Sequence, residues 1–216
     1  MAIRYQNFDA LYNKEYLDIY RLCFLLVRHG KAAEEMAFQT FLKMGTEKVE
    51  YDEKGERLTL YNHCLRTCED FYYRKLRRRP GRKALEEMQL CFPVTDALVE
   101  LLHQTFLKRA CLFLHGFYEF SLEDTARIAK CPVFRAGHMV KDYNAETAQL
   151  INSILPDGEF HEQLNDRIYM RFSERSVSVE NALAGIRSWF DRAVPFLALI
   201  VVLFMIFAVY YVNHLF

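Results

Sequence analysis

The feature that most constrains this chain is its C-terminal end, which carries no charged side chain. All 28 basic and 28 acidic residues lie at or before Arg192, and the 24 residues from Ala193 to Phe216 contain none of them. A helix of about 20 apolar residues, rising about 1.5 Å per residue, crosses the hydrocarbon layer of a membrane. The run from Ala193 to Val212 meets this requirement, and we therefore expect a transmembrane helix over 192–213.

The residues that flank the apolar run predict its orientation. Lys and Arg are retained on the cytoplasmic side of a membrane, and here they occur only before the run, at Arg175, Arg187 and Arg192. The first residues of the chain lack the unbroken apolar core of a signal peptide. We therefore expect a single-pass protein of the cell membrane whose large N-terminal part is cytoplasmic.

The composition of the remaining chain favours helices. A hydrophobic content of 52% excludes a wholly disordered chain, and only 8 Gly and 5 Pro argue against a turn-rich β-sandwich. Apolar residues recur at helical spacing over 8–26, 36–44 and 58–72, which predicts a three-helix bundle. A further stripe over 99–113 predicts another helix.

We therefore expect an all-α protein with two small helical domains and a C-terminal transmembrane helix. Pro80 and Gly81 open a stretch that is typical of a domain boundary. The predicted parts are a helical bundle at 1–79, a linker at 80–95, a helix-turn-helix domain at 96–155, an amphipathic juxtamembrane segment at 156–191 and the span at 192–213. The juxtamembrane segment could lie on the lipid surface, pair with a partner or fold back on the body.

A basic run ends the predicted bundle. The stretch from Arg66 to Lys83 contains eight basic residues and only two acidic residues, Glu69 and Asp70. Its net charge is therefore +6 in a neutral protein. Such a run can be a solvated helix end, a phosphate-contacting patch for nucleic acid, or a patch for anionic lipid. Aromatic residues among these charges, such as Tyr73, could stack on unpaired bases.

The segment after residue 120 has the pattern of a helix-turn-helix. Ser121 can cap a helix, with Asp124 completing a capping box, and Pro132 favours the start of a second helix after a short turn. We expect this second helix to continue through Ile154. Four polar side chains would remain available to a DNA groove: Arg135, His138, Lys141 and Asp142.

Neither a metal site nor an enzyme is expected from the sequence. The chain has six cysteines, which in a reducing compartment favour buried thiols over disulfides. His63, Cys64 and Cys68 share a helix face, but no second ligand pair at zinc spacing follows. No Gly-rich phosphate loop, nucleophile motif or acid/base constellation is present, and no cofactor is implied.

The order of these parts resembles the extracytoplasmic-function sigma factors, the small promoter-recognition subunits of bacterial RNA polymerase, over about residues 5–150. Ala33, Glu34 and Phe41 match the family pattern AED-x-x-Q-x-x-F of conserved region two. The stretch LYNHCLRTCEDFYYRKLRRR is similar to the helix that reads and melts the proximal promoter element. Residues of the helix-turn-helix that fit the family's region four are Tyr118, Ser121, Ala126 and Ile128.

The resemblance implies a non-enzymatic transcription initiation factor that is held at the membrane. Its partners would be core RNA polymerase, promoter DNA and membrane lipid, with a regulatory membrane protein or a protease controlling its release. Polymerase would be bound by Glu34, Glu35 and Phe41. DNA would be bound by Arg66, Tyr73, Arg74, Lys75, Arg77, Arg78, Arg79, Arg135, His138 and Lys141.

A second interpretation is a tail-anchored helical adaptor or signalling protein, with a degenerate sigma fold and no promoter recognition. Phe38, Leu60 and Thr67 stand where the family usually has Gln, Trp and Asn. These departures, and a weakly basic recognition helix, favour the adaptor.

Overall fold

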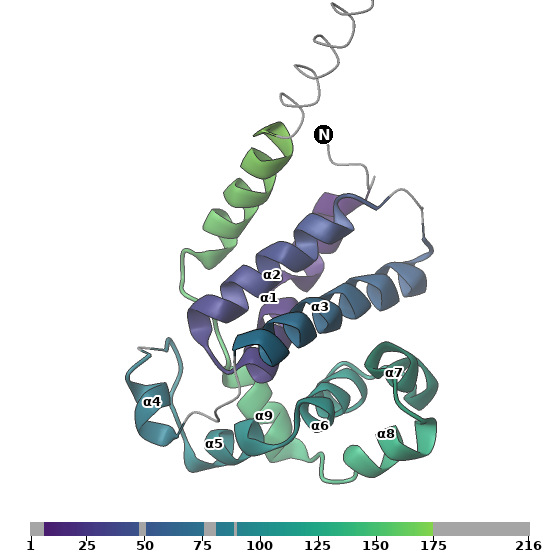
Figure 1. The fold of residues 1–216 in the computed structure, drawn as a ribbon, viewed down its shortest axis with the longest axis vertical. Coiled ribbons are helices and arrows are strands. Elements are labelled where there is room, and N and C mark those ends of the chain that lie inside the picture. The colour runs from purple at the N-terminus through teal and green to yellow at the C-terminus, as the bar shows by residue number, and fades with distance from the viewer. Residues whose placement is uncertain (1–6, 48–50, 76–80, 89, 175–216) are drawn as a thin grey trace, which may run out of the picture. The chain divides into compact units, whose positions relative to one another are not determined.

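A computed structural model describes residues 7–47, 51–75, 81–88 and 90–174, without the side chains of 73–75 (Figure 1). The described residues up to 169 belong to one compact unit, and the helical residues 170–174 belong to a second. The described residues contain helices and no strand, which confirms the all-α prediction. The helices are α1 (Phe8–Val27), α2 (Gly30–Met44), α3 (Glu53–Lys75), α4 (Arg82–Glu86), α5 (Asp96–His103), α6 (Phe106–Cys111), the π-helix η1 (Leu112–Phe117), α7 (Leu122–Ala129), α8 (Val133–Met139), α9 (Ala145–Ser153) and one over 160–174.

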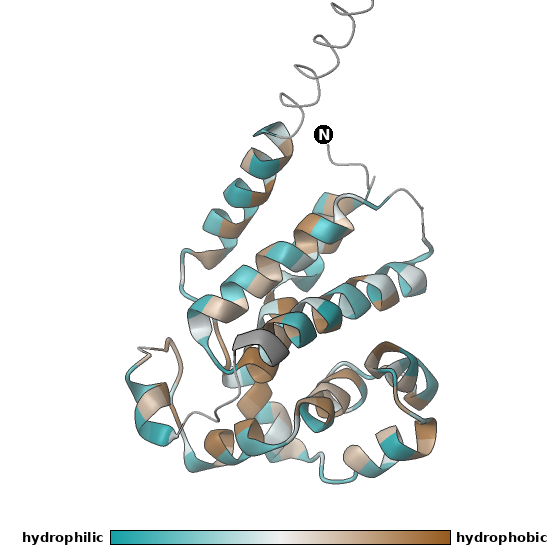
Figure 2. Ribbon diagram, in the orientation of Figure 1, coloured by the Kyte–Doolittle hydropathy of each residue, from teal (hydrophilic) through white to brown (hydrophobic). Residues whose placement is uncertain are grey.

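The first three helices pack against one another as the sequence predicts. The chain turns sharply between α1 and α2, because Arg28 adopts a left-handed conformation with φ of 58°. Hydrophobic and hydrophilic residues alternate along the helices (Figure 2), so each helix can bury one stripe. The buried face includes Phe41, whose ring meets the edge of the Tyr12 ring at a centroid distance of 5.0 Å.

Two segments that the pattern predicts as single helices are each divided. The stripe over 99–113 extends across α5, α6 and η1, since Thr105 Oγ1 accepts a hydrogen bond from the Lys108 N–H at 3.2 Å and so caps α6. Asn144 Oδ1 accepts from the Thr147 N–H at 2.8 Å, and α9 therefore begins separately from α8. The single-helix predictions were wrong because these capping side chains interrupt apolar stripes that otherwise keep helical spacing.

The segment predicted as a linker, 80–95, contains α4 and packs against the bundle. Leu85 is fully buried, and the Phe92 ring meets the edge of the Phe24 ring at a centroid distance of 5.0 Å. Farther along the chain, α6 packs on α1 and α7 packs on α3. The bundle and the helix-turn-helix therefore contact each other directly within the unit formed by residues 3–169.

Two buried charged side chains connect the bundle to the helices that follow it. Arg109 of α6 is fully buried, and its Nη2 donates to the Leu26 carbonyl of α1 at 3.1 Å. Glu15 of α1 accepts at Oε2 from the hydroxyls of Tyr61, at 3.0 Å, and Tyr118. Buried polar groups are costly unless they are hydrogen-bonded, so these contacts favour one arrangement of the helices.

The beginning of the predicted juxtamembrane segment folds back on the body. Phe160 packs on Tyr20 at a ring-centroid distance of 5.0 Å, and the Tyr12 hydroxyl donates to the His161 carbonyl at 2.9 Å. Of the three arrangements left open by the sequence, the described part of this segment adopts the folded-back one.

The predicted transmembrane helix at 192–213 lies outside the described residues. Within the described ranges, no helix is both long enough and apolar enough to cross a membrane.

Candidate nucleic-acid interface

The helix-turn-helix is formed by α7 and α8. As predicted, Ser121 caps α7: its Oγ accepts from the Asp124 N–H at 3.1 Å. Lys130 ends α7 in a left-handed conformation with φ of 50°, and Pro132 stands at the N-cap of α8. The second helix therefore begins at Val133, three residues after Lys130, which is the short connection of a helix-turn-helix.

The outer face of α8 is exposed and carries the predicted DNA contacts. Arg135 and His138 are exposed on the helix, and Lys141 is exposed in the turn that follows it. Beside them, Phe134 exposes 76% of its surface. This short face offers a ligand one guanidinium group, one imidazole group, one ammonium group and one large aromatic ring.

A groove of about 520 Å³ brings two of the predicted DNA-binding arginines together. Arg66 enters it from α3, and Arg135 enters it from α8. Lys130, at the turn between α7 and α8, adds a third basic group. Tyr72 and Phe106 provide aromatic walls, with their rings 5.2 Å apart between centroids. The groove therefore combines three cations and two aromatic rings with one carboxylate, that of Glu69; cations of this kind bind phosphates, and aromatic rings stack on bases.

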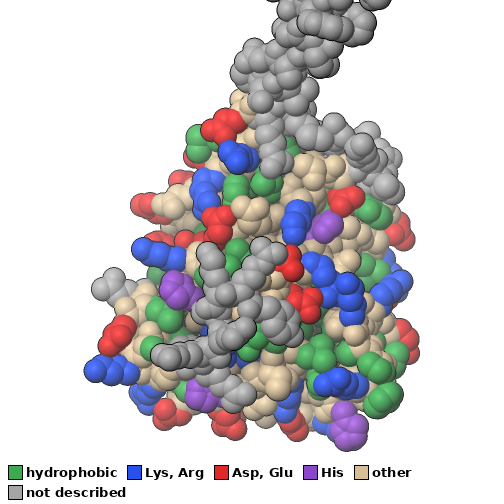
Figure 3. Space-filling view, viewed as in Figure 1, with side chains coloured by type: hydrophobic (Ala, Val, Ile, Leu, Met, Phe, Trp, Pro, Cys, Tyr) green, Lys and Arg blue, Asp and Glu red, His purple; other side chains and the backbone are tan. Residues whose placement is uncertain are grey.

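Arg66 is also a structural residue of this groove. Its Nη2 donates to the Ile128 carbonyl of α7 at 2.7 Å, and its Nη1 pairs with Glu69 Oε2 at 2.6 Å. Both contacts hold the guanidinium at the junction of α3 and α7, and the carboxylate partly offsets its charge. On the face drawn in Figure 3, basic and acidic side chains are interspersed, so the described surface there is not one continuous basic field.

For the rest of the predicted DNA-binding residues of the basic run, the structure describes no side chains. Tyr73, Arg74 and Lys75 belong to the last turn of α3, but only their backbone is described. Arg77, Arg78 and Arg79 lie outside the described residues. The predicted end residues of the span, Ala193 and Val212, lie outside them as well.

The residues predicted to bind polymerase are divided between surface and core. Phe41 is completely buried, so its side chain packs the bundle and is not available to a partner. Glu34 is half-buried, and burial together with the charge of Asp157 raises the pKa of its carboxyl group. Glu35 Oε2 forms an ion pair at 2.6 Å with Nη2 of Arg167, which lies in the helix at 160–174. The helix at 160–174 therefore covers part of the α2 surface that was predicted to bind polymerase.

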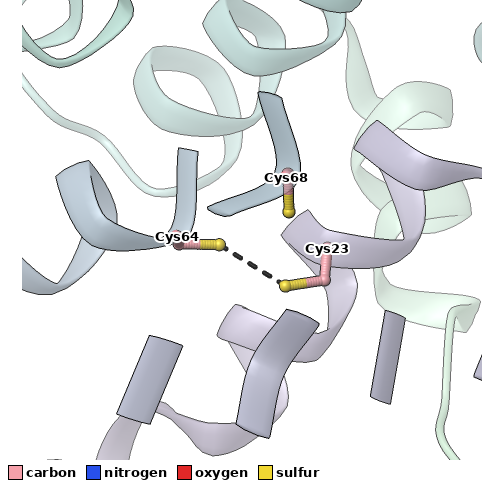
Figure 4. A group of neighbouring side chains, drawn as sticks. All are labelled: Cys23, Cys64 and Cys68. Carbon is pink, nitrogen blue, oxygen red and sulfur yellow. Dashed lines mark hydrogen bonds between the residues drawn. The ribbon is translucent and has the colours of Figure 1, made fainter. Parts of the chain in front are cut away.

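A cluster of three thiols, which the sequence interpretation did not assemble, lies inside the bundle (Figure 4). Cys23 of α1 and Cys64 and Cys68 of α3 are fully buried, and their three sulfurs lie within 4.8 Å of one another. The Cys23 and Cys64 sulfurs are 3.5 Å apart, within hydrogen-bonding distance. Cys64 and Cys68 form an i, i+4 pair in the sequence, but their pairing with Cys23 depends on how α1 packs against α3.

Burial and hydrogen bonding act in opposite directions on the pKa values of the three thiols. Burial raises the pKa of Cys23 and Cys68. Burial also acts to raise the pKa of Cys64, but hydrogen bonds from Cys23, Cys68 and Thr40 outweigh it and lower that pKa below its ordinary value.

Comparisons with protein-family models, curated proteins and solved structures found no match to this chain. Any assignment of function therefore depends on the residues and the geometry described above.

Proposed function

We propose that this protein is a membrane-anchored, sigma-like transcription initiation factor that binds promoter DNA and core RNA polymerase. The observation that carries the proposal is the groove between α3, α6 and the α7–α8 turn, where Arg66, Lys130 and Arg135 meet Tyr72 and Phe106. The sequence resemblance assigns DNA contacts to both helices independently, and the groove joins them.

The proposed binding mode uses the two parts of the site differently. Arg135 and His138 on the exposed face of α8 would contact base edges and phosphates in the major groove of a duplex. Arg66 and the basic end of α3 would hold the backbone of an opened strand, whose bases would stack near Tyr72. Phosphate contacts would position the complex, and captured bases would give it sequence preference.

The polymerase contact would use the surface next to Glu34 and Glu35. Glu35 is paired with Arg167, whose guanidinium also lies 4.4 Å from the centre of the Phe38 ring. Polymerase binding at this face would therefore require the helix at 160–174 to move away. Because the predicted anchor follows that helix, an event at the membrane or a proteolytic cut could control the contact.

The experiment that tests DNA binding is a salt titration on the full chain in detergent micelles, with duplex and bubble DNA probes. Arg135→Gln should weaken binding and reduce the slope of log affinity against log salt by about 1, as expected for a lost phosphate contact. The matched control is Arg171→Gln, since Arg171 is an exposed arginine outside both the groove and the basic run at 66–83. Equal slopes for wild type and Arg135→Gln, or no binding by folded wild type, would contradict the proposal.

A second candidate function is the tail-anchored adaptor. It is favoured by the exposed apolar residues that begin α8, where Phe134 exposes 76% and Val133 43% of their surfaces. Such a pair at the surface suits a protein partner at least as well as DNA. Phe134→Ser would then abolish capture of a protein partner, whereas under the sigma-like proposal Arg135→Gln has the larger effect on DNA binding.

A further inference from the structure

The three-thiol cluster has the geometry of a metal site. Figure 4 shows the Cys23, Cys64 and Cys68 sulfurs directed toward a common point, with two helices supplying them. Metal–sulfur bonds of about 2.3 Å place bound sulfurs about 3.8–4.0 Å apart. The sulfurs here lie within 4.8 Å of one another, and one pair is at 3.5 Å. Small side-chain movements would therefore bring all three to bonding distance from one ion.

The number and type of donors limit the choice of ion. In the described part of the chain, the group contains three Cys residues and no His, Asp or Glu. Soft thiolates bind monovalent copper, zinc and iron–sulfur clusters. Structural zinc sites are closed by four protein ligands, whereas monovalent copper accepts three sulfur donors. The cluster is fully buried, so water has no direct access to supply a fourth ligand.

Charge near the cluster is compatible with a monovalent ion. Lys43 Nζ donates to Thr67 Oγ1 at 2.8 Å, and Thr67 directly precedes Cys68 in α3, so a positive charge lies near the cluster. Bound Cu⁺ with two thiolates and one neutral thiol carries a single negative charge, which this ammonium group can offset. Starting from three thiols, such binding releases two protons.

We propose that Cys23, Cys64 and Cys68 form a three-sulfur binding site for one monovalent copper ion, between α1 and α3. The site joins residues 41 positions apart in the chain, so a bound ion would fasten α1 to α3. It lies inside the bundle and does not depend on DNA binding. Uptake of the ion would require transient opening of the bundle, and loading would therefore be slow.

The test loads the full chain with Cu⁺, in detergent and without oxygen, against a copper chelator. Wild type should retain about one ion per chain, with a sulfur-only coordination shell in the X-ray absorption spectrum at the copper edge. The variant Cys23→Ser, Cys64→Ser, Cys68→Ser should retain none at the same chelator concentration. The matched control is Cys111→Ser, because Cys111 is equally buried but lies outside the cluster.

A second measurement keeps the proposal falsifiable if the triple variant does not fold. Under partial denaturation, an alkylating reagent should modify Cys23, Cys64 and Cys68 at least tenfold more slowly in copper-loaded wild type than in metal-free protein. The rate of modification of Cys111 should be the same in both. The proposal fails if copper protects all cysteines equally, if Cys111→Ser loses the ion as well, or if Zn²⁺ displaces Cu⁺ from the cluster.

Discussion

The charged network around Glu15 should contribute measurably to the stability of the fold. Glu15 is 1% exposed and accepts hydrogen bonds from Tyr61 and Tyr118, while Arg57 Nε lies 3.6 Å from its second oxygen. Arg57 Nε also donates to the Tyr118 hydroxyl at 2.8 Å, and its guanidinium lies 4.5 Å from the centre of that ring. These four residues connect α1, α3 and the segment before α7.

Glu15→Gln keeps the size of the side chain but removes its charge. The new amide group turns a donor toward groups that also donate, so at least one buried hydrogen bond is lost. Each unsatisfied buried group costs about 1–3 kcal/mol, and breaking a buried ion pair costs about 3–5 kcal/mol. Because Arg57 is about one third exposed and keeps part of its hydration, we expect the lower range, about 2–3 kcal/mol.

Thermal unfolding of the full chain in detergent, followed by circular dichroism, measures this effect. For a domain of this size the expected loss corresponds to a fall in Tm of about 5–10 °C. Glu53→Gln is the matched control, since Glu53 forms a 2.7 Å ion pair with Lys14 on the surface and should leave Tm unchanged. Equal Tm values for wild type and Glu15→Gln would refute the assignment of a stabilising role to the network.

Three further predictions concern the backbone and the pH dependence of folding. Gly116→Ala should destabilise the fold by about 1–3 kcal/mol, because its Cβ would lie 2.4 Å from the Tyr143 ring; a denaturation curve that matches wild type would contradict this. Lys130→Gly should stabilise it by about 0.5–1 kcal/mol, since glycine relieves the left-handed φ of 50°, and the same denaturation assay measures the gain. Burial raises the folded-state pKa of Tyr20 and Tyr118, so their contribution is fully present below the unfolded pKa of about 10 and is lost as the pH rises above it. A melting temperature that stays constant from pH 9 to pH 11 in wild type would argue against this last effect.

Helical spacing predicts the bundle well because each of its helices buries one continuous stripe. The predicted stripes over 8–26, 36–44 and 58–72 fall within α1, α2 and α3. The same rule failed where a capping residue lies inside a stripe. Thr105 and Asn144 stop helices through side-chain hydrogen bonds, and an apolar periodicity does not register such bonds.

The candidate sites show the same limit at the level of tertiary structure. Ser121 was recognisable as a cap because its partner is three residues away. Cys23 was not recognisable as a partner of Cys64 from spacing alone, although each lies on a buried stripe of its own helix. The packing of Phe41 in the core also required the structure, since a matching motif residue can be buried by a neighbouring helix.

The most direct test of the central claim mixes the full chain, in detergent micelles, with bacterial core RNA polymerase and a random promoter library. The account predicts that the two proteins co-elute and that transcripts begin at a defined motif, with Arg135→Gln reducing transcription and Arg171→Gln leaving it unchanged. Removal of the 2.6 Å Arg167–Glu35 ion pair by Arg167→Gln should strengthen co-elution. A folded chain that neither binds polymerase nor starts transcription would contradict the sigma-like function and favour the adaptor.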